Sequence, residues 1–251
     1  MSESTESSTE RSPFTKPGFI ISAALVIALI AAVIVIFFLP KGDSTAQPAP
    51  APSSAGASSA PSKSAGTAGK SICGLPSSTE TALGTAPKSK WELVGKMAAP
   101  TDPKTFGPGL TDGDGFRSCF AQSPTGALFA AANVIALGSS TTLDKVKLVE
   151  NFVVPGSGRD AAIADTKAKA SATSSSGGAP QFQGFLIKSF TPAEADVDVA
   201  FQLATGQYAH TVLSLRWVDG DWKVKAADDG QIFNAVAQLS DLSGFILWTG
   251  V

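Results

Sequence analysis

Few residues of this chain could do acid–base chemistry. His210 is the only histidine, and Tyr208 precedes it by two residues, on the same face of a predicted strand. With a carboxylate, such a pair could act as general acid and base in the pocket of a cone-shaped α+β domain. The carboxylates of the preceding predicted strand, Asp196 and Asp198, alternate with apolar residues and are predicted to point outward. The sequence therefore predicts no catalytic residues, since His210 has no obvious partner.

Three other segments resemble functional motifs without completing them. Asp112-Gly-Asp-Gly matches the start of a calcium loop, but Phe116 occupies the third acidic position and the final glutamate is missing. Gly156-Ser-Gly-Arg lacks the Lys-Ser/Thr of a phosphate-binding loop. Ser123 is followed by Pro-Thr-Gly and does not lie in the Gly-x-Ser-x-Gly elbow of a hydrolase. We interpret these segments as a turn, the start of a helix and a helix N-cap, respectively.

Two cysteines, Cys73 and Cys119, are the remaining reactive side chains. A zinc site lacks ligands, because the chain has no Cys-x-x-Cys pair and only one histidine. We therefore predict neither a metal nor a cofactor. If the domain lies outside the cytoplasm, a Cys73–Cys119 disulfide is the simplest interpretation, and two buried free thiols are the alternative.

An uncharged apolar run occupies residues 18–39. As a helix it would span about 33 Å, enough to cross the hydrocarbon core of a bilayer. We interpret it as a transmembrane helix, because it is longer than the apolar region of a signal peptide. A cleaved signal peptide is the alternative. Arg11 and Lys16 on its N-terminal side predict a cytoplasmic N-terminus and an extracytoplasmic C-terminal domain, in a single-pass protein of the cell membrane.

Composition divides the chain into four predicted parts: a cytoplasmic tail (1–17), the transmembrane helix (18–39), a linker rich in Pro, Ala, Ser and Gly (40–70), and an extracytoplasmic α+β domain (71–251). The last part carries 14 Lys and Arg against 17 Asp and Glu, without a basic stripe. Direct binding of nucleic acid is therefore not expected.

Helical patterns precede strand patterns within the domain. Apolar residues recur at helical spacing over 124–137, 143–153 and 158–172. Strands are predicted over 91–97, 182–190, 194–204, 208–218 and 222–226, the last four as a meander. Alternation with a period of two turns four apolar side chains toward the helices: Leu213, Leu215, Trp217 and Trp222. This order predicts an α+β fold in which helices pack on one face of a curved antiparallel sheet.

Three motifs, taken in order, resemble a known family. They are Gly107-Pro108 with Asp112-Gly113 and Gln122-Ser-Pro-Thr-Gly-Ala-Leu-Phe-Ala-Ala-Ala-Asn, then Val153-Val-Pro-Gly-Ser-Gly-Arg-Asp, and finally Leu242-Ser-Gly-Phe-Ile-Leu-Trp-Thr-Gly-Val. Following an anchor and a linker, this set is similar to a family of actinobacterial membrane-anchored proteins associated with integrative conjugative elements. The cysteines are not part of that pattern. The order of elements also resembles the NTF2-like domains of conjugation and type IV secretion scaffolds of the VirB8 and TcpC kind, which implies an NTF2-like cone over about residues 120–227.

The resemblance implies a non-enzymatic scaffold or assembly subunit of a cell-envelope complex, within a conjugation or type IV secretion-like DNA-transfer apparatus. The expected partners are the membrane, through a single span, and protein subunits of that complex, with a homo-oligomer left open. The alternative is a small-molecule-binding or enzymatic NTF2-like domain that uses the cone as a pocket. A pocket needs convergent polar groups, whereas the apolar segment 244–248 could plug the cone and favours the scaffold.

Overall fold

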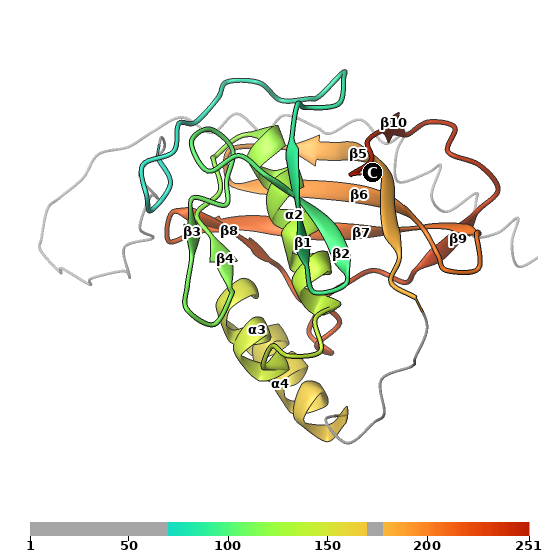
Figure 1. Cartoon of the computed structure of the whole chain (residues 1–251). Coiled ribbons are helices and arrows are strands. Elements are labelled where there is room, and N and C mark those ends of the chain that lie inside the picture. The colour runs from blue at the N-terminus through green and yellow to red at the C-terminus, as the bar shows by residue number, and fades with distance from the viewer. Residues whose placement is uncertain (1–69, 170–177, 251) are drawn as a thin grey trace, which may run out of the picture. The chain divides into compact units, whose positions relative to one another are not determined.

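In the described part of the chain, an antiparallel sheet of six strands forms the framework (Figure 1). The computed structural model describes residues 70–169 and 178–250. A continuous meander consists of β5 (Gln181–Phe190), β6 (Glu194–Gln202), β7 (Tyr208–Val218) and β8 (Asp221–Val224). Two short strands extend it, since β10 (Ile246–Leu247) pairs with β5 and β9 (Ala237–Leu239) pairs with β7.

Alternation along the strands decides which face of the meander is buried. Leu213 and Leu215 of β7 are fully buried, and Val197, which lies opposite Leu213 on β6, is buried with them. Trp222 of β8 is also buried, and Trp217 packs against the same core while keeping part of its surface exposed. The inward face predicted from the sequence is therefore confirmed.

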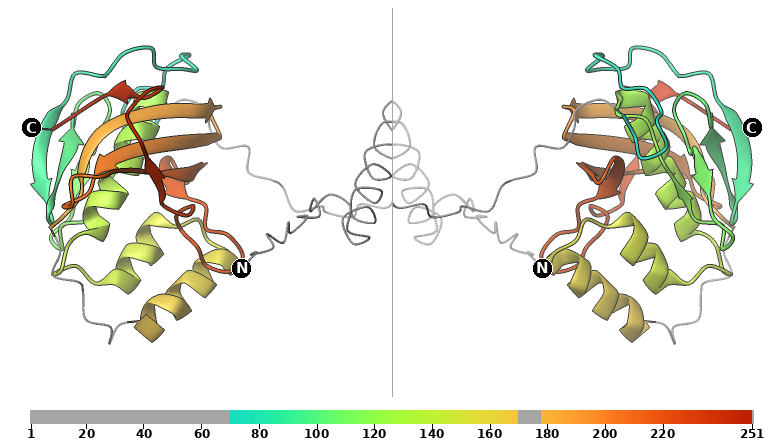
Figure 2. Two further views of the ribbon diagram at one scale, coloured as in Figure 1. Left: turned by 90° about the vertical axis from the view of Figure 1, so that its right-hand side faces the viewer. Right: turned by 90° about the vertical axis from the view of Figure 1, so that its left-hand side faces the viewer.

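Helix α2 (Pro124–Gly138) lies against this inward face. Ser123 caps it as predicted, because its hydroxyl accepts a hydrogen bond from the amide of Gly126 at 3.0 Å. Almost every residue of the helix is buried, since strands cover it on two sides (Figure 2). A Cβ at Gly126 would lie 2.0 Å from the carbonyl oxygen of Ala121, so the chain can turn into the helix this closely only with glycine.

The strands on the second side of α2 form a hairpin where the sequence predicts a single strand over 91–97. The structure has β1 (Lys90–Val94) and β2 (Met97–Thr101) in antiparallel register. Gly95 opens the turn between them with a φ of 59°. The prediction missed this turn because two five-residue strands are too short to show a clear period. A smaller hairpin follows, formed by β3 (Leu110–Thr111) and β4 (Arg117–Ser118).

Two shorter helices, α3 (Lys145–Phe152) and α4 (Ser157–Lys169), follow α2. The helical pattern over 143–153 predicts Thr141 or Thr142 as the N-cap of α3, and this prediction is wrong. Asp144 is the cap, and its carboxylate accepts hydrogen bonds from two amides of the first turn at 2.8 and 3.1 Å. A carboxylate is favoured there because it also interacts with the positive end of the helix dipole.

The C-terminal segment completes the core. Trp248 is 4 % exposed, and its ring lies 5.9, 5.6 and 4.6 Å from the rings of Phe129, Phe185 and Trp91. These three residues belong to α2, β5 and β1. Trp248 therefore fills the space where the sheet, the central helix and the β1–β2 hairpin meet.

The predicted fold class, an N-terminal transmembrane helix plus an NTF2-like domain, is wrong. Within 70–169 and 178–250, no helix is long and apolar enough to cross a membrane, and residues 18–39 lie outside the described residues. The sheet has six described strands where a meander of four was predicted. Elements from outside residues 120–227, namely the β1–β2 hairpin and Trp248, are part of the main core. The predicted cone omits them because their partners are distant in sequence.

We predict that Leu215→Ala lowers the free energy of unfolding by about 2 to 5 kcal/mol, because truncation of a fully buried leucine leaves a cavity. Leu93→Ala is the matched control, since Leu93 is 77 % exposed and its loss should cost less than about 0.5 kcal/mol. Urea titration followed by tryptophan fluorescence measures both. Equal costs for the two variants would contradict the assignment of the inward face.

Candidate functional site

His210 has a partner in the structure, contrary to the sequence prediction. Its Nδ1 lies 2.8 Å from Oδ1 of Asp198 on the neighbouring strand β6. The ring of Phe245 packs edge-on against the imidazole at a centroid distance of 5.8 Å. Asp198 is only 4 % exposed although it alternates with the inward-facing residues of its strand. The prediction missed this pair because the covering residue comes from the C-terminal segment.

The His210–Asp198 pair lacks the other parts of an acid–base site. Four clefts of about 210 to 580 Å³ lie on the described part of the chain, and His210, Asp198 and Tyr208 line none of these four. Tyr208 shares the strand with His210, but no hydrogen bond joins it to the pair among the described residues. The geometry favours a structural pair, in which the imidazole satisfies a carboxylate that would otherwise be buried without a partner.

Asp196 belongs to a hydrogen-bonded row that crosses three strands. It accepts hydrogen bonds from the hydroxyls of Ser189 on β5 and Ser214 on β7, at 2.8 and 2.7 Å. Partial burial raises the pKa of Asp196, but these two hydrogen bonds and the charge of Arg216 outweigh burial and leave the pKa below its ordinary value. Asp196 therefore stays ionised near neutral pH and stabilises the pairing of the strands.

A disulfide joins Cys73 to Cys119, as the sequence analysis predicts. The segment beside it is also held by the backbone, since the amide of Ile72 donates a hydrogen bond to the carbonyl of Gly220 at 2.9 Å. A Cβ at Gly109 would lie 2.5 Å from Sγ of Cys73, so glycine is required next to the cross-link. The disulfide and this hydrogen bond together fix the start of the described chain against the turn between β7 and β8.

Asp221 is a buried carboxylate that sequence reasoning did not identify. Its Oδ2 accepts a hydrogen bond from the amide of Cys119 at 2.7 Å, and its Oδ1 accepts from the amides of Phe120 and Trp222 at 2.8 and 2.9 Å. Burial raises the pKa of Asp221, against the opposing effect of these three backbone hydrogen bonds. The available signal was the position of this acidic residue directly after Asp219-Gly220, a tight-turn sequence, and before the strand predicted over 222–226.

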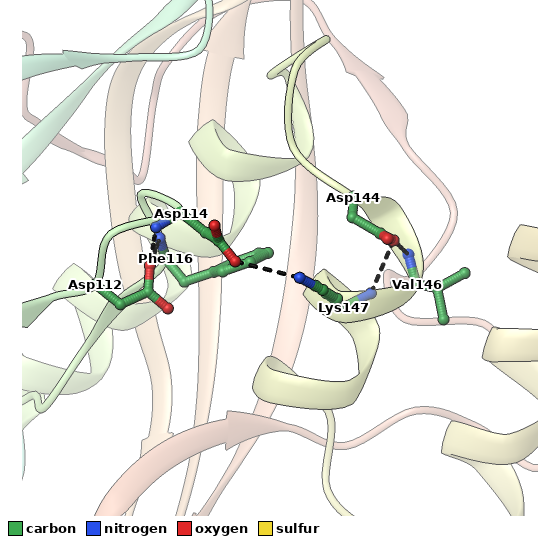
Figure 3. A network of polar contacts seen from close by, with 6 residues as sticks. All are labelled: Asp112, Asp114, Phe116, Asp144, Val146 and Lys147. Carbon is green, nitrogen blue, oxygen red and sulfur yellow. Dashed lines mark hydrogen bonds and ion pairs between the residues drawn. The ribbon is translucent and has the colours of Figure 1, made fainter.

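The Asp112-Gly-Asp-Gly segment is a turn, as predicted (Figure 3). Oδ1 of Asp112 accepts hydrogen bonds from the amides of Asp114 and Phe116 at 3.0 and 2.8 Å, which leaves that oxygen engaged by the backbone. Asp114 forms an ion pair with Lys147 of α3 at 3.2 Å, which connects the β3–β4 turn to the helix. Among the described residues, no three His, Cys, Asp or Glu side chains gather into a group that could hold a metal.

Arg117 links the smaller hairpin to strand β1 and to helix α2. Its guanidinium forms an ion pair with Glu92 of β1 at 2.6 Å and donates a long hydrogen bond to the side chain of Asn133 at 3.5 Å. Asn133 is fully buried in α2 and donates to the carbonyl of Pro100 at 3.0 Å. No sequence pattern indicated this network, because its members are spread over four elements.

The fold and these contacts define a domain of three helices and an antiparallel sheet in the described residues, cross-linked by one disulfide. The chain matches the family described as "Domain of unknown function (DUF8175)" over residues 48–247 and belongs to that family. No curated protein and no solved structure matches the chain.

We predict that Asp221→Asn lowers the free energy of unfolding by about 1 to 3 kcal/mol, because the new amide group would face the amide of Cys119, donor against donor. Asp219→Asn is the control, since Asp219 is exposed, has a φ of 55° and tolerates asparagine. Urea titration measures both variants. Equal stability of the two variants would contradict the proposed role of the buried carboxylate.

A comparison of the wild type with Asp221→Asn at several pH values tests the direction of the pKa shift of Asp221. A raised pKa means that folded Asp221 holds its proton at pH values where the unfolded chain has released it. This stabilisation is fully present below the ordinary pKa of 3.8 and is lost as the pH rises through the higher folded value. The difference in unfolding free energy between wild type and Asp221→Asn should therefore shrink as the pH rises above 3.8. A difference that grows over this range would reverse the sign.

We predict that cleavage of the disulfide lowers the free energy of unfolding by up to about 4 kcal/mol, because the cross-link closes a long loop in the unfolded chain. The two cysteines are 46 positions apart. Mass spectrometry of the unreduced protein should find the two peptides linked, and urea titration with and without a reductant gives the energy. Two alkylatable thiols in freshly isolated protein would contradict the pairing.

Proposed function

We propose that this protein is a non-enzymatic scaffold or assembly subunit of a cell-envelope complex, and that the complex is a conjugation or type IV secretion-like DNA-transfer apparatus. In this proposal the described domain lies on the extracytoplasmic side of the cell membrane. Its partners are other protein subunits, and it does not contact DNA directly.

The observation that carries the proposal is the filled interior of the domain. Trp248 occupies the junction of the sheet, α2 and the β1–β2 hairpin, with aromatic rings around it. An enzyme or a ligand-binding cone needs a cavity with convergent polar groups at this place. The aromatic packing favours a domain that works through its surface, which is how scaffold subunits act.

The disulfide supports the proposed compartment. Disulfides persist in oxidising surroundings outside the cytoplasm and are rare within it. Cys73 and Cys119 are cross-linked, and the described residues contain no free cysteine. The ordered sequence motifs support the assignment to DNA transfer.

Gene replacement tests both levels of the proposal. Deletion should lower the transfer frequency of the genetic element that carries the gene, and the wild-type gene should restore it. His210→Gln should restore it equally, because glutamine keeps a hydrogen-bond donor for the buried Asp198 but cannot act as a general acid or base.

Each negative result has its own meaning. Unchanged transfer after deletion would contradict the conjugation role alone. A His210→Gln protein that accumulates normally but fails to restore function would contradict the non-enzymatic role. Crosslinking in intact cells that yields only the monomer would contradict the assembly role.

A further inference from the structure

The largest of the four clefts described above lies at the open end of the β1–β2 hairpin, beyond its last paired residues, Lys90 and Thr101. Its volume is about 580 Å³. One wall is the stretch from Lys88 to Lys90, which leads into β1, and the other is the stretch from Thr101 to Lys104, which follows β2. This volume lies within the usual range of about 300 to 1,000 Å³ for small-molecule sites.

Three lysines line this cleft, and their side chains have no partner among the described residues. Lys88, Lys90 and Lys104 make no ion pair and no side-chain hydrogen bond with any described residue. Asp102 is the only acidic residue among the lining residues. Its Oδ1 accepts hydrogen bonds from the amides of Lys104 and Thr105 at 3.3 and 3.1 Å, so that oxygen shapes the turn. The cleft therefore has an excess of positive charge within a domain that carries a net negative charge.

Thr101 also lines the cleft. Thr101 is 4 % exposed, and its hydroxyl has no hydrogen bond among the described residues. Among the described residues, Arg159 Nε is the one fully buried side-chain nitrogen or oxygen without a partner, so the hydroxyl oxygen of Thr101 keeps access to solvent. The unpaired hydroxyl of Thr101 and the side chains of the three lysines therefore belong to residues that line the same cleft from both walls.

The wall that carries Lys88 and Lys90 is connected to the aromatic core. The hydroxyl of Ser89, between the two lysines, accepts a hydrogen bond from the indole of Trp248 at 3.3 Å and donates one to the carbonyl of Pro87 at 3.1 Å. The opposite wall is held by the turn at Asp102, whose carbonyl accepts hydrogen bonds from the amides of Phe106 and Gly107 at 3.1 and 2.7 Å. Both walls are therefore held in place without a ligand, so a ligand would not have to order them.

We propose that this cleft binds a multivalent phosphate group. Lysine ammonium groups act as point charges for phosphate, and three of them suit a ligand with more than one negative charge. The hydroxyl of Thr101 would donate a hydrogen bond to a phosphate oxygen. The ligand is either a small polyphosphate or a phosphodiester polymer of the cell envelope. The inference goes beyond the proposed scaffold function and does not depend on it.

Titration calorimetry of the full-length protein tests the proposal, with inorganic tripolyphosphate as the probe of a small ligand and poly(glycerol phosphate) as the probe of a polymer. At low salt at least one probe should bind with a stoichiometry of one site per chain, and added salt should weaken binding. Tighter binding of tripolyphosphate assigns the site to a small ligand, and tighter binding of the polymer assigns it to the envelope. Binding of neither probe would overturn the proposal.

Two matched triple variants distinguish the effect of positive charge in the cleft from the effect of the net charge of the protein. The first triple variant should bind the phosphate probe about tenfold more weakly or worse than the wild type. It combines Lys88→Gln, Lys90→Gln and Lys104→Gln. Lys96→Gln with Lys167→Gln and Lys188→Gln removes the same charge from exposed lysines that do not line this cleft, and should change affinity by less than about twofold. Equal losses in the two triples, or no loss in the first, would overturn the assignment.

Thr101→Val supplies a readout that a purely structural role would not change. Valine keeps the shape of the side chain, and the hydroxyl has no partner to lose, so the unfolding midpoint should stay at or above that of the wild type. The affinity for the phosphate probe should nevertheless fall by about threefold or more. An unchanged affinity of Thr101→Val would show that Thr101 is not part of the site. An acidic peptide serves as a further probe of the wild-type protein. Tight binding of this peptide, with no binding of either phosphate probe, would identify a different ligand class and overturn the proposal.

Discussion

The buried carboxylate of Asp221 is the contact on which much of this domain depends. It gathers the amides of Cys119 and Phe120 against the first residues of β8. Cys119 can then hold a φ of 64°, which is unfavourable for a residue with a side chain unless its surroundings impose it. The indole of Trp222 adds a hydrogen bond to the carbonyl of Ala121 at 2.9 Å, just before α2 begins. The side chains of Asp221 and Trp222 thus connect the start of β8 to the disulfide and to the residues that lead into the central helix.

The aromatic core sets the second constraint, because it is built from segments that are far apart in the chain. Trp91 comes from the first hairpin, Phe129 from α2, Phe185 from β5 and Trp248 from the C-terminal segment. None of these segments has a complete apolar surface of its own to bury, so each becomes stable only with the others in place. Contacts of such large sequence separation carry a cost in loop closure, which the burial of several aromatic rings offsets.

Local patterns in the sequence predicted those parts of the fold that local physics determines. The Ser123-Pro124 cap gave the start of α2, and alternation along 208–218 gave the inward face of β7, because both signals lie within one element. The same reasoning failed where a distant segment changes the surroundings of a residue. Asp198 was predicted to face solvent, but the segment that carries Phe245 covers this part of the sheet, so that a polar position became buried. The cleft lined by Lys88, Lys90 and Lys104 could not be predicted from the sequence either, because its two walls meet only after β1 and β2 have paired.

The disulfide also determines how the domain would respond to mechanical tension. If the chain is pulled through the residues ahead of Lys70, the covalent path runs from Cys73 directly to Cys119 and bypasses the loop between them. The β1–β2 hairpin lies inside that bypassed loop. A stretching force would therefore act first on the start of α2 and on the edge of the sheet. The hairpin and its cleft would carry no load until those elements unfolded.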